Sequence, residues 1–362
     1  MKLKELLELT TERGASDLHI VCGSAPVLRI NGELIILEEM GKVTPQIAKD
    51  YVYEMLNEQQ IKSFESECDL DFSFGIAGLG RFRVNLHKQR SSIGIALRRL
   101  ASEIKTVDEL ELPSIVKEFA MLDKGMVLVT GAAGSGKSTT LASMINIINT
   151  RRKAHVITVE DPIEYLYAHK NSIIEQREVG SDTKSFASAL KYVLRQDPNV
   201  ILVGELRDLE TIAHAITAAE TGHLVLGTLH TTDAVQTIDR LIDVFPPYQQ
   251  QQVRIQVSLT LQGVICQQLM LSTDKKRRVP VVETMVATSA IRNLIREGKT
   301  FQIYSSLETG VKVGMQSVDM ALADLAHKGL IPEEDAYLKA RDADGVKRRL
   351  KKLQEIAKNA GG

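Results

Sequence analysis

A glycine-rich segment directly after a short apolar run constrains the fold of this chain most. Residues 126–130 read MVLVT, which predicts a buried strand, and residues 131–138 read GAAGSGKS. This spacing fits the P-loop pattern GxxxxGK[ST], in which glycines let backbone amides turn toward an anion and a following helix adds its positive end. The segment therefore predicts a strand, a tight loop and a helix in succession, the unit from which α/β folds are built.

The same pattern predicts a nucleoside-triphosphate site, with ATP and Mg²⁺ as ligands. We expect Lys137 to neutralise the β- and γ-phosphates and the Ser138 hydroxyl to ligate Mg²⁺. A chance match is expected in about one chain in a hundred of this length, and the strand-loop-helix context makes it rarer. The predicted nucleotide-binding residues are Gly131, Ala132, Ala133, Gly134, Ser135, Gly136, Lys137, Ser138 and Thr139.

Short apolar runs and helical segments alternate through the second part of the chain. This alternation predicts a parallel sheet covered by helices, and from about residue 246 onward the pattern is mostly helical. The tail 341–362 carries seven Lys or Arg and three Asp or Glu, which we interpret as a solvated helix face. Strands are expected at 126–130, 154–159, 200–203 and 224–228, and helices from 137, near 184–196 and near 209–220.

The first hundred residues predict a separate, small α+β domain. Asn31-Gly32 between two apolar runs predicts a two-residue hairpin, and Thr44-Pro45 predicts the start of a helix. Because 362 residues exceed what one hydrophobic core usually holds, two domains are expected. We place an N-terminal domain at 1–99, a linker at 100–112 and a second domain at 113–362, helical from about 288.

Polar side chains follow three further predicted strands. Glu205 follows the apolar run 200–203 shortly after its end, where a Walker-B acid would lie near Mg²⁺. His230 follows the strand 224–228 and is a candidate γ-phosphate sensor. Acids at 160, 161 and 164 follow the strand 154–159, where an exposed loop is the alternative interpretation. No grouping with metal-ligand spacing surrounds His230, so a transition-metal site is not expected there.

Composition limits the partners. A net charge of -1, an aromatic content of 4% and the absence of Trp do not favour a nucleic-acid partner. Three scattered cysteines fit neither a disulfide framework nor a four-thiolate zinc site, so a reducing cytosol is expected. No apolar run approaches the ~20 residues of a membrane span, and charges interrupt the N-terminus, so membrane contact is expected only through partner proteins.

Together these motifs resemble the secretion ATPases of type II and type IV systems, and within them the type IV pilus retraction ATPases. The resemblance covers nearly the whole chain and includes the segment AIRNLIRE at 290–297. It also rests on ASDLHI at 15–20, EDPIE at 160–164, the Walker-B segment 197–208 and the histidine segments at 221–223 and 230–232. It implies a PAS-like N-terminal domain, a RecA-like P-loop ATPase core and a helical C-terminal portion. It further implies a cytoplasmic homohexamer at the pilus base, bound peripherally to the inner membrane through a platform protein.

The resemblance also suggests residue roles. Glu164 would be the general base or the acid that positions water, and Glu205 would act on Mg²⁺. The Gly204-Glu205 pair stands where generic P-loop enzymes have an aspartate, which leaves the division of labour between the two glutamates open. Arginines from a neighbouring subunit should complete the site, with Arg81, Arg83 and Arg240 as candidates.

Three other functions compete with pilus retraction. One is an assembly or secretion motor of the same family, although such proteins usually carry paired Cys-x-x-Cys zinc ligands and a longer N-terminal region. The second is a DNA-directed RecA-like ATPase, which charge and aromatic content disfavour. The third is a nucleotide-gated scaffold that does not hydrolyse ATP.

Overall fold

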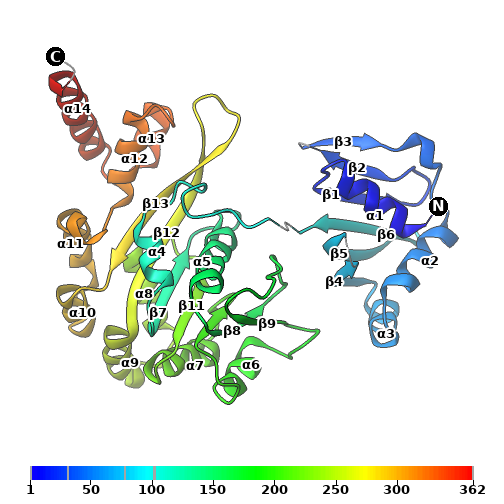
Figure 1. Cartoon of the computed structure of the whole chain (residues 1–362), viewed down its shortest axis with the longest axis horizontal. Coiled ribbons are helices and arrows are strands. Elements are labelled where there is room, and N and C mark those ends of the chain that lie inside the picture. Colours follow the sequence, from blue (N-terminus) through cyan, green and yellow to red (C-terminus); the bar gives the residue numbers. More distant parts are fainter. Residues whose placement is uncertain (1, 31, 77–78, 101–102, 361–362) are drawn as a thin grey trace. The chain divides into compact units, whose positions relative to one another are not determined.

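The computed structural model describes residues 2–30, 32–76, 79–100 and 103–360 (Figure 1). The chain divides into two compact units. One consists of Met1–Glu103 with Pro162–Leu166, and the other of Ile104–Asp161 with Tyr167–Gly362.

The described part of the N-terminal unit holds a six-stranded antiparallel sheet in the order β3-β2-β1-β6-β5-β4. Helices cover one face, where alternate strand residues such as Leu18, Phe82 and Leu97 are fully or almost fully buried. The strands are β1 (Asp17–Val21), β2 (Val27–Ile30), β3 (Glu33–Ile36), β4 (Asp69–Ile76), β5 (Gly80–Gln89) and β6 (Ser92–Arg99). The helices are α1 (Leu3–Glu12), α2 (Pro45–Met55) and α3 (Glu58–Glu67), with a 3-10 turn at Glu38–Met40.

The helix start and the hairpin that local sequence patterns predict in this unit are both present in the structure. Thr44 caps α2 by accepting a hydrogen bond from the backbone N of Ile47 at 3.2 Å. The hairpin between β2 and β3 is present, with Ile30 opposite Glu33 and Gly32 at φ 91°. Asn31 of the predicted turn lies outside the described residues. The PAS-like character of the unit stays a prediction.

The second unit is built on a seven-stranded mixed sheet in the order β13-β12-β7-β11-β10-β8-β9. Neighbouring strands from β12 to β9 are parallel, and β12 and β13 form an antiparallel hairpin. Every residue of β7, β10 and β11 is buried, which accounts for their uninterrupted apolar sequences. The strands are β7 (Gly125–Thr130), β8 (His155–Glu160), β9 (Ile173–Glu178), β10 (Val200–Val203), β11 (Leu224–Leu229), β12 (Leu261–Leu271) and β13 (Arg278–Val286).

Helices cover both faces of this sheet, each over its own apolar core. Leu128 and Val203 face the core formed with α6 to α9, whereas Val127 and Leu202 face the core formed with α4 and α5. The helices are α4 (Ile115–Ala120), α5 (Lys137–Arg151), α6 (Phe186–Val193), α7 (Leu209–Glu220), α8 (Ala234–Asp243) and α9 (Pro247–Thr260). The predicted α/β class is confirmed.

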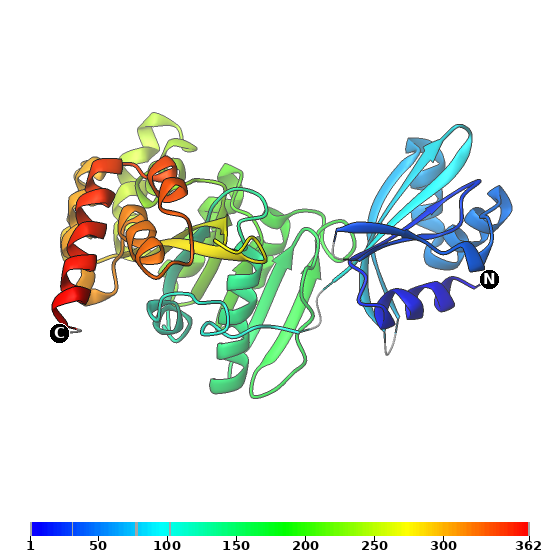
Figure 2. The ribbon, with the colours of Figure 1, turned by 90° about the horizontal axis from the view of Figure 1, so that it is seen from above.

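The C-terminal helices, coloured gold to red in Figures 1 and 2, follow the hairpin. Those after residue 317 pack with one another and with Val279 and Val281 of β13. Among the described residues, none of the helices combines the length and apolarity needed to cross a bilayer. The helices are α10 (Ser289–Arg296), α11 (Ile303–Thr309), α12 (Val318–His327), α13 (Glu333–Lys339) and α14 (Ala343–Ala360), with 3-10 turns at Thr300–Gln302 and Val311–Val313.

One sequence expectation about this sheet is wrong, because the sheet is mixed rather than parallel. The region after residue 246 is mostly helical, as expected, but it also contains the long hairpin of β12 and β13, which the sequence analysis missed. The edge strand β9 was not expected either, because four of its six residues have charged or amide side chains. β12 follows α9 without a turn and contains Gln267-Gln268, so its sequence lacks a clear strand signal.

Candidate active site

The P-loop connects β7 to α5, as the sequence predicts. Gly131 has φ 141°, and a Cβ there would lie 2.2 Å from the backbone O of Gln267. Gly136 caps α5 with φ 91°. Both positions need glycine, the first for close packing as well as conformation and the second for its left-handed backbone.

The donors that gather at this loop fit a triphosphate with its magnesium ion. Lys137 folds back over the loop and donates from Nζ to the backbone O of Gly131 at 2.8 Å and of Ala132 at 3.0 Å. In any α-helix the first-turn amides lack a partner within the helix, so those at the start of α5 can bind an anion. Ser138 and Thr139 lie in that same turn and are half-buried.

Gln267 of β12 holds the P-loop in place through a hydrogen bond to its backbone. Its side chain is buried and donates from Nε2 to the backbone O of Ser135 at 2.9 Å. Sequence analysis missed this residue because the two positions lie 132 residues apart and no local pattern connects them.

The sheet brings the other candidate residues to the same edge as the P-loop. β7, β11, β10 and β8 are consecutive and parallel, so their carboxyl ends lie together. β11 is followed by His230, and β10 by Gly204 and then Glu205. Ligands of open α/β sheets bind at this edge.

Glu205 and His230 are in contact range of each other. The Glu205 Oε1 lies 3.5 Å from the His230 Nε2, and the Glu205 Oε2 lies 3.6 Å from the Arg207 Nε. Arg207 also reaches Asp161, with 3.2 Å between its Nη2 and the Asp161 Oδ2. Because Arg207 is half exposed, these pairs stabilise the fold little and mainly orient the carboxylate.

A cavity of about 270 Å³ lies at this pair. It brings together three of the predicted site residues, Glu205, His230 and Arg240. Arg240 comes from α8 and lines this cavity of its own chain, and its action on a neighbouring subunit stays a prediction. The lining residues are Glu205, Leu206, Arg207, Leu229, His230, Thr231 and Arg240.

The strand end of β8 explains the glycine before Glu205. A Cβ on Gly204 would lie 3.2 Å from the Cα of Glu160 and 3.2 Å from the backbone O of Val159. The Glu160 carboxylate itself is buried and accepts a hydrogen bond from the Thr158 hydroxyl at 2.7 Å. The close approach of β10 and β8 thus fixes where the chain turns to present Glu205.

Other predicted residues lie elsewhere. Glu164 is exposed in the loop after β8, in the segment that groups with the N-terminal unit. Arg81 and Arg83 lie on β5 of that unit. No cluster of three His, Cys, Asp or Glu side chains able to hold a metal ion occurs among the residues that the structure describes.

Arg81 and Arg83 belong to a basic face of the N-terminal sheet. Arg83 lies opposite Arg98 of β6, and Arg98 forms an ion pair of 2.8 Å with Asp17, which also lies 3.9 Å from Arg29. Burial raises the pKa of Asp17, but its hydrogen bonds and its pairing with Arg98 together hold that pKa below the ordinary value. Asp17 therefore stays charged between arginines.

The two histidines that bracket β11 occupy opposite ends of the strand. His223 precedes β11, and its Nδ1 lies 3.0 Å from the backbone O of Ala218 and 3.1 Å from the Thr221 hydroxyl. His230 follows β11 at the P-loop edge. Of the two, only His230 lies at the candidate site.

Comparison with known proteins identifies the family. The model of the type II/IV secretion system protein family matches residues 95–276. The chain belongs to this family. It is 46% identical to the type IV pilus retraction ATPase PilT of Pseudomonas aeruginosa over 94% of this chain and 98% of that protein. It is 46% identical to a twitching motility protein of Neisseria gonorrhoeae over 89% of this chain and 86% of that protein.

Solved structures agree. The crystal structure of the pilus retraction motor PilT with bound ADP has a TM-score of 0.90 and 46% identity, covering 96% of this chain and 99% of that one. The type IV pilus assembly ATPase PilB of Acinetobacter baylyi is 43% identical, but only over 44% of this chain and 28% of that protein. The resemblance to the type IV pilus retraction ATPases is therefore confirmed, and the assembly motor is the poorer match to this secretion ATPase.

Proposed function

We propose that this secretion ATPase is the subunit of a homohexameric motor that hydrolyses ATP to retract type IV pili. The observation that carries the proposal is the meeting of the P-loop, Glu205 and His230 at one sheet edge, in a chain related over nearly its whole length to a retraction ATPase. We place the motor in the cytoplasm at the pilus base, bound peripherally to the inner membrane through a platform protein.

Nucleotide binding falls to the P-loop. The Lys137 ammonium and the amides at the start of α5 would hold the phosphates, and Thr139 would contribute its hydroxyl. Mg²⁺ would be held by the Ser138 hydroxyl and the Glu205 carboxylate. When bound, it neutralises charge that builds on the phosphoryl oxygens during transfer.

Hydrolysis falls to groups outside the P-loop. His230 is 53% exposed and can turn from Glu205 toward a γ-phosphate, which would make it a sensor of that group. Glu164 would orient or deprotonate the attacking water. Arg81 and Arg83 would come from a neighbouring subunit, because their basic face offers permanently charged guanidinium groups to a phosphate. Arg240 stays a third candidate for the arginine supplied by a neighbour, although it also lines the cavity of its own chain.

Loss of the P-loop lysine tests the nucleotide site. We expect Lys137→Ala to abolish ATP hydrolysis and strongly weaken ATP binding, because the triphosphate loses its main fixed countercharge. Lys153→Ala is the matched control, since Lys153 is an exposed lysine before β8, at the opposite edge of the sheet. Turnover near wild type in purified Lys137→Ala would contradict the assignment.

Amide variants test the two glutamates. Glu164→Gln and Glu205→Gln should both fold, retain ATP and hydrolyse it poorly, because the amide keeps the shape but removes the base or the charge near Mg²⁺. Full activity of Glu164→Gln beside an inactive Glu205→Gln would mean that the base is not Glu164.

Assembly and cellular role need separate measurements. Specific activity should rise with protein concentration, since an arginine supplied by a neighbour is worth ~10³–10⁵ in turnover in related chemistry. Constant specific activity down to a demonstrated monomer would refute the role of the neighbour.

Deletion of the protein should leave cells hyperpiliated and unable to retract pili, and normal retraction would refute the cellular role.

A further inference from the structure

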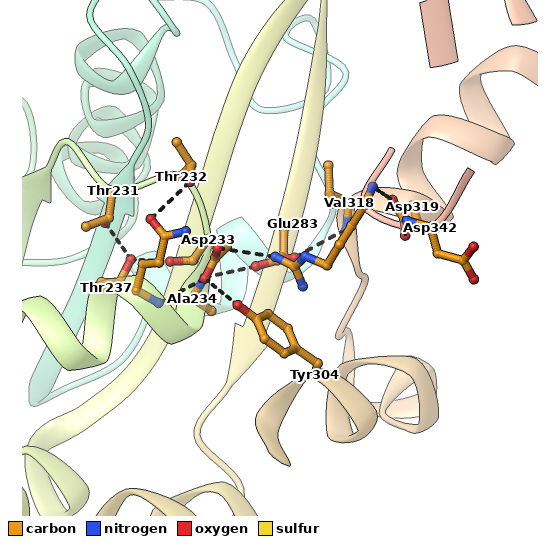
Figure 3. A network of polar contacts seen from close by, with 12 residues as sticks. Thr231, Thr232, Asp233, Ala234, Thr237, Glu283, Tyr304, Val318, Asp319 and Asp342 are labelled. Atoms are coloured by element: carbon orange, nitrogen blue, oxygen red, sulfur yellow. Dashed lines mark hydrogen bonds and ion pairs between the residues drawn. The ribbon is translucent and has the colours of Figure 1, made fainter. Parts of the chain in front are cut away.

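A polar network with buried carboxylates at its centre joins the loop after β11 to the C-terminal helices (Figure 3). Asp233 stands at its centre, with a side chain that is only 8% exposed. Its Oδ1 accepts hydrogen bonds from the backbone N of Gln236 at 2.9 Å and from the Tyr304 hydroxyl at 3.2 Å. Its Oδ2 lies 3.2 Å from the Nη2 of Arg341. Asp233 thus caps α8 and binds two groups from the C-terminal part of the chain.

Arg341 is held in place from several sides. Its guanidinium Cζ lies 3.8 Å from the centre of the Tyr304 ring. Its backbone N donates to the Asp319 Oδ1 at 2.8 Å, which ties the connection between α13 and α14 to α12. The Arg341 side chain is 40% exposed, as expected for a solvated tail, but it also pairs with Asp233, which comes from a distant part of the sequence.

A second buried carboxylate, that of Glu283, adds negative charge close to Asp233 and the Arg341 guanidinium. Glu283 of β13 is 2% exposed, and burial raises its pKa. Its Oε1 accepts from the backbone N of Ala234 at 2.9 Å and its Oε2 from that of Val318 at 3.4 Å, so it binds the first turns of α8 and α12. Arg341 acts electrostatically on Glu283 as well as pairing with Asp233.

The network continues from Asp233 to the candidate site. The Thr237 hydroxyl donates to the backbone O of Asp233 at 2.7 Å, and the Thr231 hydroxyl lies 2.7 Å from that of Thr237. Since the proton of Thr237 is already donated, Thr231 is the donor of this second bond. Thr231 lines the cavity next to His230. A shift of Asp233 would therefore move the loop that carries both residues.

We propose that Arg341 is a positioning residue for ATP hydrolysis, which acts through Asp233 to hold Thr231 and His230 against Glu205. This inference rests on the proposed role of His230 at the γ-phosphate. Without Arg341, two neighbouring buried carboxylates lose a shared cation, and we expect the start of α8 to shift. A displacement of ~1 Å at a catalytic group can cost about 100-fold in rate. The P-loop leaves a different strand, so ATP binding should persist.

Steady-state kinetics of three single variants test this. We expect Arg341→Ala to lower kcat by about 10- to 100-fold and to change KM for ATP by less than about 2-fold. Arg341→Lys should recover part of kcat, because it keeps the charge without the stacked planar group. Arg349→Ala is the matched control, since it removes an ion pair of 3.1 Å with Asp324 that joins α14 to α12. It should retain near-wild-type kcat.

A double-mutant cycle tests whether Arg341 acts through Asp233. Asp233→Asn keeps an acceptor for capping α8 but removes the charge, so it should show the same fall in kcat at constant KM. It also serves if Arg341→Ala does not fold. The double variant should be no slower than the slower single variant.

Three results would overturn the proposal: equal kcat for Arg341→Ala and Arg349→Ala, a raised KM at unchanged kcat, or multiplicative losses in the double variant. An inactive Lys137→Ala beside a fully active Arg341→Ala overturns this inference alone. Activity in Lys137→Ala instead overturns the proposed function.

Discussion

Arg292 of the AIRNLIRE segment closes the end of the preceding helix rather than facing solvent. It lies on α10, and its Nη1 donates to the backbone O of Ser258 at 2.8 Å and of Leu259 at 3.0 Å, the last turn of α9. Its Nη2 donates to the Gln262 Oε1 at 2.9 Å. A cation at the carboxyl end of a helix satisfies its free carbonyls and interacts favourably with its dipole.

We expect Arg292→Ala to destabilise this unit measurably. A hydrogen bond from a charged group is worth about 1.5–3 kcal/mol when buried, and we take roughly 1 kcal/mol for each here because the side chain is partly exposed. Three bonds then give about 3 kcal/mol. For a domain of this size that corresponds to a fall of about 6–12 °C in Tm.

Thermal unfolding followed by circular dichroism, with urea unfolding as a second probe, measures this loss. Arg296→Ala is the matched control on the same helix, because the exposed Arg296 reaches only the Asn293 Oδ1, at 3.4 Å, in the contacts described for it. It should change the free energy of unfolding by less than about 0.5 kcal/mol. Equal Tm values for the two variants would refute the capping role of Arg292.

Two further variants test other contacts. Gln267→Leu should raise KM for ATP about 5-fold, because the P-loop loses the hydrogen bond to the backbone O of Ser135, worth roughly 1 kcal/mol. Gln268→Leu is the control on the opposite face of β12 and should leave KM unchanged. Equal KM values for the two variants in kinetic assays would contradict the role of Gln267. Asp17→Asn should lower the free energy of unfolding at pH 7. The difference in the free energy of unfolding between variant and wild type should shrink as the pH falls below 3.8, because the lowered pKa of Asp17 adds stability only while the group is charged. A difference that stays constant across pH in urea unfolding would refute this role of Asp17.

Local patterns predicted the parts of the fold whose causes are local. The P-loop glycines, the cap at Thr44 and the buried strand 200–203 each carry their reason within a few neighbouring residues. The AIRNLIRE segment likewise has apolar residues at helical spacing, and Ile291 and Ile295 of α10 are buried.

The structural features that the sequence analysis missed depend on pairing between segments that are far apart in the chain. The strand character of β12 comes from its pairing with β7, and Gln267 has meaning only beside Ser135. Arg341 carries the same charge as its basic neighbours in the tail and is partly exposed like them, and only the fold shows that it pairs with Asp233. Charge patterns along one helix do not reveal such partners.

The two histidines at the ends of β11 offer a built-in pair of spectroscopic reporters. The strand Leu224–Leu229 has six residues, so at ~3.3 Å per residue about 20 Å separates its ends. The imidazole of His230 lines the cavity, whereas that of His223 is held by Ala218 and Thr221 at the far end. In a nuclear magnetic resonance titration with nucleotide, the ring signals of His230 should move while those of His223 provide an internal reference on the same strand.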